Sequence, residues 1–83
     1  MSGLTLDKLV YMANQIATAF RQQGDGAAAA TYDHLWHFWD PRMRARIIAH
    51  WRDGGEGLNE IAAAAIDMLA ERDAAGAARL SGG

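Results

Sequence analysis

The chain has 83 residues, no cysteine and a formal net charge of −2. A chain of this length forms one domain, residues 1–83, and buries only about 60–65% of the surface that its unfolded state exposes, so association with a partner would help to stabilise it. The composition excludes disulfides, thiolate metal sites and a general attraction to nucleic acid, and the lack of a signal-peptide pattern or of an apolar run of ~20 residues predicts a cytoplasmic protein without a membrane span.

The first predicted helix covers residues 5–23. Apolar residues recur at the i, i+3, i+4 and i+7 spacing of one helix face. The members of this face are Leu6, Leu9, Val10, Ala13, Ile16, Ala17 and Phe20. Thr5 is a suitable N-cap, Asp7 in the first turn suits the helix dipole, and Gly24 ends the helix.

The second predicted helix starts at Asp25 or Gly26 and ends at Trp39. Its shared face contains Ala27, Thr31, His34, Leu35 and Phe38. The helix cannot continue, because Pro41 disfavours the helical conformation of Asp40 and would clash with the carbonyl four residues before it. The same two residues start a third helix, with Asp40 as N-cap and Pro41 at the first helical position.

The third helix is predicted to run from Pro41 to about Arg52, and residues 53–57 form a glycine-rich loop. Asn59 then caps a fourth helix that ends near Gly76, and residues 77–83 are expected to fray. The apolar stripe of this helix contains Ile61, Ala62, Ala65, Met68 and Leu69. No alternation typical of strands is present, so the predicted fold is all-α, a compact bundle of four short helices with a tight Asp-Pro corner between the second and the third.

The sequence offers little for catalysis or metal binding. His34 and His37 have i, i+3 spacing and lie near Asp33 and Asp40, but no second pair of ligands completes a zinc site. The serines lie near the chain ends, the threonines have no base at a recognisable spacing, and the glycine loop lacks the lysine and the preceding strand of a phosphate loop. We therefore predict that the chain alone is not an enzyme and holds no metal.

Three arginines at alternate positions, Arg42, Arg44 and Arg46, also suggest a DNA-binding recognition helix. The acidic net charge, the tight corner and the two adjacent indoles argue against this interpretation. We predict no binding to nucleic acid.

Residues 34–47 nevertheless concentrate bulky aromatic and cationic side chains. Arg42 and Arg44 lie in the first turn of the third helix, where the helix dipole repels each cation by a few tenths to ~1 kcal/mol. Trp36 lies opposite the apolar stripe of its helix, whereas Trp39 could plug the corner or belong to the surface. Because Trp and Arg are enriched at interface hot spots, this stretch predicts a protein-docking surface.

Two segments have specific motifs, LVYMANQIA at residues 9–17 and HLWHFWDPRMR at residues 34–44. They resemble the delta subunit of NAD-dependent formate dehydrogenase, and the resemblance extends over the first three predicted helices. Tyr11 and Trp36 stand where basic residues are expected in that family, which makes this surface more aromatic. The matched positions are Asn14, Gln15, His34, Phe38, Trp39, Asp40, Pro41, Arg42, Met43 and Arg44.

The resemblance implies a non-catalytic subunit that supports the assembly, cofactor retention or stability of a cytoplasmic formate dehydrogenase. It places a molybdenum or tungsten pterin and iron–sulfur clusters in the large catalytic subunit, which is the expected partner, and it places flavin and NAD binding in another subunit. No cofactor is expected in this chain.

The predicted partner-binding residues combine the docking surface with the matched positions. They are Asn14, Gln15, Trp36, Trp39, Arg42, Met43, Arg44 and Arg46, with Asp40 and Pro41 as the structural cap of the third helix. Asn14 and Gln15 lie off the apolar stripe, and an ordinary polar face explains them equally well. Two other functions stay open, a self-associating module that forms a homodimer and a maturation chaperone that leaves the finished enzyme.

Overall fold

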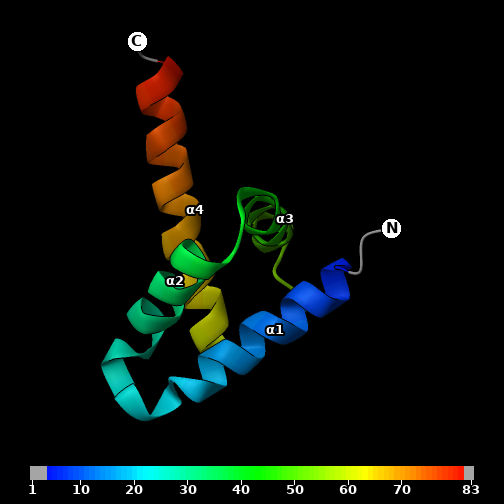
Figure 1. Ribbon diagram of the computed structural model, residues 1–83, viewed down its shortest axis with the longest axis vertical. Coiled ribbons are helices and arrows are strands. Elements are labelled where there is room, and N and C mark those ends of the chain that lie inside the picture. The colour runs from blue at the N-terminus through cyan, green and yellow to red at the C-terminus, as the bar shows by residue number, and fades with distance from the viewer. Residues whose placement is uncertain (1–3, 82–83) are drawn as a thin grey trace.

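The computed structural model describes residues 4–81, and side chains as far as Gly76, and over this range the chain is built from helices joined by short connections (Figure 1). The elements are α1 (Leu6–Ala19), the 3-10 segment η1 (Arg21–Gly26), α2 (Ala27–Phe38), α3 (Pro41–Arg52) and α4 (Glu60–Ser81). No strand occurs within the described range, so the predicted all-α class is confirmed. None of these helices is both long and apolar enough to cross a membrane.

Helix α1 begins as predicted but ends earlier. The Thr5 hydroxyl accepts a hydrogen bond from the Lys8 N–H at 3.2 Å. The helix stops at Ala19, and the chain tightens into η1, where the Gln23 N–H donates to the Phe20 carbonyl at 2.9 Å. The predicted extension of this helix to Gln23 is therefore wrong. The reversal itself falls at Gly24, whose φ of 59° strains any residue with a side chain.

Helix α2 buries a face that differs from the predicted one. Ala27, Thr31 and Leu35 are buried, and the Thr31 hydroxyl donates to the Ala27 carbonyl at 2.8 Å, so this buried polar group is satisfied. His34 is only half-buried and Phe38 is 74% exposed, so their predicted place on the buried face is wrong. The buried residues are spaced four apart, and four residues rotate an α-helix by about 40° more than one full turn. The face therefore rotates toward Trp36 and Trp39, where α4 packs against α2.

The corner between α2 and α3 consists of two extended residues. Trp39 has φ −91° and ψ 138°, and Asp40 has φ −73° and ψ 166°, as expected before a proline. The Asp40 carboxylate accepts a hydrogen bond from the Met43 N–H at 2.9 Å, and α3 starts at Pro41. Trp39 is 4% exposed and belongs to the core.

The connection from α3 to α4 contains three glycines with positive φ. Gly55 has the least space, because a Cβ atom there would lie 3.1 Å from a ring carbon of Trp51. The Gly55 N–H donates to the His50 carbonyl at 2.9 Å, and the His50 ring nitrogen Nε2 lies 2.7 Å from the Glu56 carbonyl. These contacts hold the glycine loop against the end of α3.

Helix α4 packs into the core between Ala62 and Ala70 and is exposed over residues 71–76. Asn59 caps it by accepting a hydrogen bond from the Ala62 N–H at 2.8 Å. The core of the molecule contains Leu9, Ala13, Ala17, Leu35, Trp39, Ile47, Ile48, Ala62, Ile66, Leu69 and Ala70. Residues 71–76 are all exposed, and this end of α4 projects beyond the other helices (Figure 1).

The predicted end of α4 near Gly76 is wrong. The helix continues to Ser81, because Gly76 keeps a helical backbone and no proline follows it. A glycine inside a helix costs only about 1 kcal/mol relative to alanine. Residues 82–83 of the predicted frayed tail lie outside the described residues.

Candidate protein-interaction surface

The three arginines of α3 do not form one patch. Residues two apart on a helix are rotated by about 200°, so Arg42 and Arg46 share one flank and Arg44 lies on the other. Arg42 and Arg46 line a groove of about 350 Å³ with Leu9 and Met43, which we call the Arg42 groove. Arg44 lines a separate groove beside Trp36 and α4.

Arg44 is held by the end of α2. Its Nη1 atom donates to the Trp39 carbonyl at 2.6 Å and to the Trp36 carbonyl at 3.1 Å. These carbonyls lie at the negative end of the α2 dipole, where a cation is favourable. The position of Arg44 near the start of α3 is thus explained by a contact within the chain.

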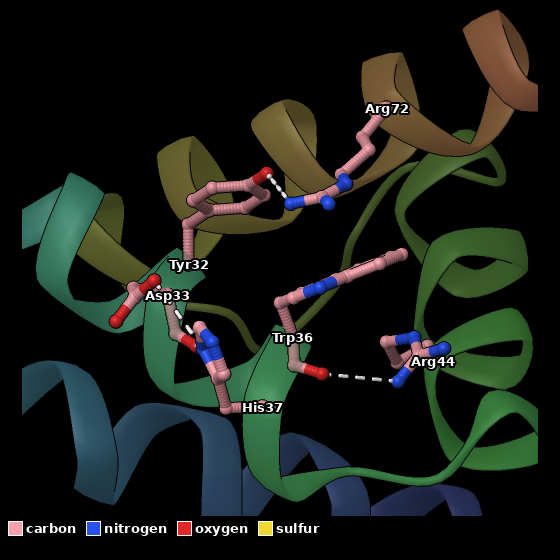
Figure 2. Close-up of polar contacts among 6 residues, drawn as sticks. All are labelled: Tyr32, Asp33, Trp36, His37, Arg44 and Arg72. Carbon is pink, nitrogen blue, oxygen red and sulfur yellow. Dashed lines mark hydrogen bonds and ion pairs between the residues drawn. The ribbon is translucent and has the colours of Figure 1, made fainter.

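The indole of Trp36 lies between two guanidinium groups. The guanidinium carbon of Arg72 is 3.6 Å from the ring centroid and that of Arg44 is 4.4 Å from it, and Figure 2 shows one arginine above the indole and the other below. The Nη1 atom of Arg72 also donates to the Tyr32 hydroxyl at 2.8 Å. Both cation–π contacts are short enough to be favourable.

Sequence reasoning missed Arg72 and Tyr32 as members of this site. Arg72 lies three residues after Leu69 and so shares a flank of α4 with a core residue, which is the signal that could have found it. This spacing could place Arg72 beside Trp36 only if the face of α2 that packs against α4 were already known.

The Trp36 groove, as we name this second hollow, has a volume of about 170 Å³. Its walls include Trp36, Pro41, Arg44, Ile48, Leu69 and Arg72. Asp73 also lines it, but makes no ion pair with either guanidinium group, and Gly76 forms an open part of its rim.

Arg42 and Arg46 differ from Arg44 in having few contacts. Arg42 is exposed, and its side chain makes no hydrogen bond or ion pair with any residue that the structure describes. Arg46 makes one long hydrogen bond, from Nη1 to the Leu4 carbonyl at 3.4 Å. Met43 is half-buried against the core. This flank of α3 leaves cationic groups available to another molecule.

Asn14 joins α1 to the start of α4. Its side-chain amide donates to the Gly57 carbonyl at 2.8 Å, and its side-chain oxygen accepts from the Asn59 N–H at 2.9 Å. Gln15 is exposed and donates to the Tyr11 hydroxyl at 2.9 Å. The polar groups of Asn14 are therefore satisfied within the chain, whereas Gln15 lies on the outer face of α1.

An aromatic row lies on the exposed side of α2. The rings of His34 and Phe38 are 4.6 Å apart, and His34 meets Phe20 edge-on at 6.1 Å. Phe38 is the most exposed large apolar side chain in the described range, followed by Tyr11 at 62%. An exposed phenylalanine beside the α2–α3 corner is a feature of interaction surfaces.

The histidines do not assemble a metal site with their neighbours. His37 contacts Asp33, with Nδ1 2.8 Å from its carbonyl and 3.3 Å from its carboxylate (Figure 2), whereas His34 stacks on Phe38. Within the described residues, no three His, Asp or Glu side chains could hold one metal ion.

Comparison with known proteins adds one match. A family model for the NADH-dependent formate dehydrogenase delta subunit FdsD matches residues 8–66 of the 83. The matched range extends from α1 into the part of α4 that packs into the core, and Arg72 lies beyond it. No curated protein and no solved structure matches the chain significantly.

Proposed function

Because the chain belongs to the NADH-dependent formate dehydrogenase delta subunit FdsD family, we propose that it is a non-catalytic subunit bound to the catalytic subunit of a formate dehydrogenase. The enzyme we propose is cytoplasmic and contains molybdenum or tungsten. In it, this chain supports assembly, cofactor retention or stability. The family match over residues 8–66 carries the proposal.

The side chains of this chain support an accessory role. The absence of cysteine means that it offers no thiolate for an iron–sulfur cluster. The part described by the structure has no convergent set of metal ligands. The chain therefore has no cysteine ligands for an iron–sulfur cluster, and we propose that the pterin, iron–sulfur and flavin groups lie in the partner subunits.

We propose that the partner covers the α2–α3 corner. Phe38 and Arg42 are exposed there, and Arg42 has no contact among the described residues to stabilise its charge. Interface hot spots commonly gain binding energy from the burial of an exposed aromatic ring and from hydrogen bonds that a partner accepts from an arginine guanidinium. Trp39 supports this surface indirectly, because its burial in the core holds the α2–α3 corner in place.

The test is co-expression of this chain with a tagged catalytic subunit. We expect the two to co-purify in a fixed ratio through size-exclusion chromatography. The double variant Phe38→Ala, Arg42→Glu should weaken the complex at least tenfold, about 1.4 kcal/mol or more. Arg21→Glu makes the same charge change as Arg42→Glu, on the exposed η1 segment, and should leave binding unchanged.

Other outcomes identify the alternative functions. Release of the chain once the enzyme has matured would make it a maturation chaperone. A homodimer by light scattering, with no binding to the catalytic subunit, would make it a self-associating module and would overturn the proposal.

A further inference from the structure

We infer that the Trp36 groove receives a carboxylate side chain, Asp or Glu, from the catalytic subunit, an inference that rests on the proposed function. The groove contains two guanidinium groups fixed on one indole (Figure 2). Arg42 and Phe38 would supply contact area at the α2–α3 corner, whereas the Trp36 groove would bind one acidic side chain of the partner.

The charge of the groove is unbalanced. In the described part of the chain the one contact between a basic and an acidic side chain joins His37 to Asp33, so neither Arg44 nor Arg72 has a carboxylate partner. Asp73 lines the groove without pairing with either of them. Two cations and one anion leave a local excess of positive charge in a chain whose net charge is −2, and this excess is complementary to one carboxylate.

Both arginines are already ordered. Arg44 is held by two carbonyls of α2, and Arg72 is held by the Tyr32 hydroxyl and by the indole. In each case the hydrogen bonds use Nη1, so donors on the other guanidinium nitrogens remain for a ligand. A preformed fork loses less side-chain entropy when a carboxylate binds.

The size and walls of the groove favour a protein side chain over a small molecule. Its volume of about 170 Å³ is below the ~300–1,000 Å³ of ordinary ligand pockets. The buried residues Ile48 and Leu69 line the groove with apolar atoms, and the lower local dielectric beside them strengthens a charge-assisted hydrogen bond. Gly76 leaves the rim open, because a Cβ there would meet open space beyond the backbone of its own helix.

The first test measures the dissociation constant of the complex between this chain and the purified catalytic subunit. It compares variants in which the charge of one arginine is changed. Arg72→Glu should weaken binding at least tenfold, and Arg72→Gln should weaken it less. Arg21→Glu, with the same change in net charge, should alter binding less than twofold. Equal binding of Arg72→Glu and the unmodified chain would overturn the inference and leave the proposed function standing. A chain that does not bind the catalytic subunit at all overturns both.

The second test identifies which chemical group of the catalytic subunit lies in the groove. It uses a substitution that keeps the positive charge at position 72. Arg72→Lys keeps the cation and provides an amine, and a carbodiimide condenses an amine with a nearby carboxylate to an amide. Lys8 is the only natural lysine, so crosslinks from lysine side chains of this variant can start only at positions 8 and 72. We expect a crosslinked peptide that joins position 72 to an Asp or Glu of the catalytic subunit, absent from Arg21→Lys. Its absence from a complex that forms normally would contradict a carboxylate in the groove.

Discussion

The Nη1 atom of Arg44 donates to the carbonyl of Trp39 at 2.6 Å, so an arginine from the first turns of α3 closes the end of α2. The two helices are separated only by Trp39 and Asp40. The contact therefore fixes the angle of the corner as well as satisfying a carbonyl.

We predict that Arg44 stabilises the isolated chain and that Arg42 does not. Arg44→Met removes hydrogen bonds from a charged donor and should lower the free energy of unfolding by about 1–3 kcal/mol. Arg42→Met removes a cation from the positive end of α3 and should be neutral or stabilising by up to ~1 kcal/mol. Urea denaturation followed by circular dichroism measures both. Equal effects of the two variants would mean that the carbonyl contacts of Arg44 do not stabilise the fold.

A second prediction concerns the link between α1 and the start of α4. Asn14→Ala removes the bonds to the Gly57 carbonyl and the Asn59 N–H, and should cost about 1–3 kcal/mol. For a domain of this size, each kcal/mol corresponds to a decrease of about 4–8 °C in the melting temperature. The neighbouring variant Gln15→Ala, on the exposed face, is the control and should shift it little. Similar shifts for both would argue against the Asn14 contacts.

A third prediction tests the length of α4. Gly76→Ala should stabilise the chain by about 0.5–1 kcal/mol and raise its helical signal, because Gly76 is helical and a Cβ there meets open space. Gly54→Ala should instead destabilise it, since Gly54 has a φ of 115°. If α4 ended at Gly76 with a left-handed glycine, the alanine at position 76 would also be destabilising.

A fourth prediction concerns the isolated chain, which should neither oxidise formate nor retain molybdenum, iron, zinc or flavin. The reason is that the chain has no cysteine for an iron–sulfur cluster, and its described part has no cluster of three ligands for a metal ion. Elemental analysis and absorbance spectroscopy of the purified protein check this. One equivalent of zinc that is lost in His34→Ala would contradict it.

Local signals in the sequence predict most of the helices. The caps at Thr5, Asp40 and Asn59 could be located because each depends on a short polar side chain just before an apolar period. The end of α1 could not, because the change to 3-10 geometry at Phe20 involves no glycine or proline. The end of α4 could not either, because a glycine inside a helix and one that ends a helix look alike in sequence.

The candidate site was less predictable, since it depends on contacts between distant residues. Periodicity indicated that Trp36 does not lie on the apolar stripe of its helix. It could not indicate that the guanidinium of Arg72 covers the indole, because Arg72 belongs to α4. The alternating arginines suggested one patch, whereas helix geometry separates Arg44 from Arg42 and Arg46 into two grooves. Both the burial of Trp39 and the exposure of Phe38 depend on the rotation of α2 against its neighbours.

The difference within α4 between its core residues and the exposed residues 71–76 has a consequence for amide hydrogen exchange. Opening the helix around Ala62 and Ile66 exposes core side chains, so exchange there requires most of the molecule to unfold. Residues 71–76 are exposed, and their amide hydrogens can exchange by local unwinding that leaves the core intact. One continuous helix should therefore show two levels of protection, and a partner seated against Arg72 would slow exchange at residues 71–76 and leave exchange around Ala62 and Ile66 unchanged.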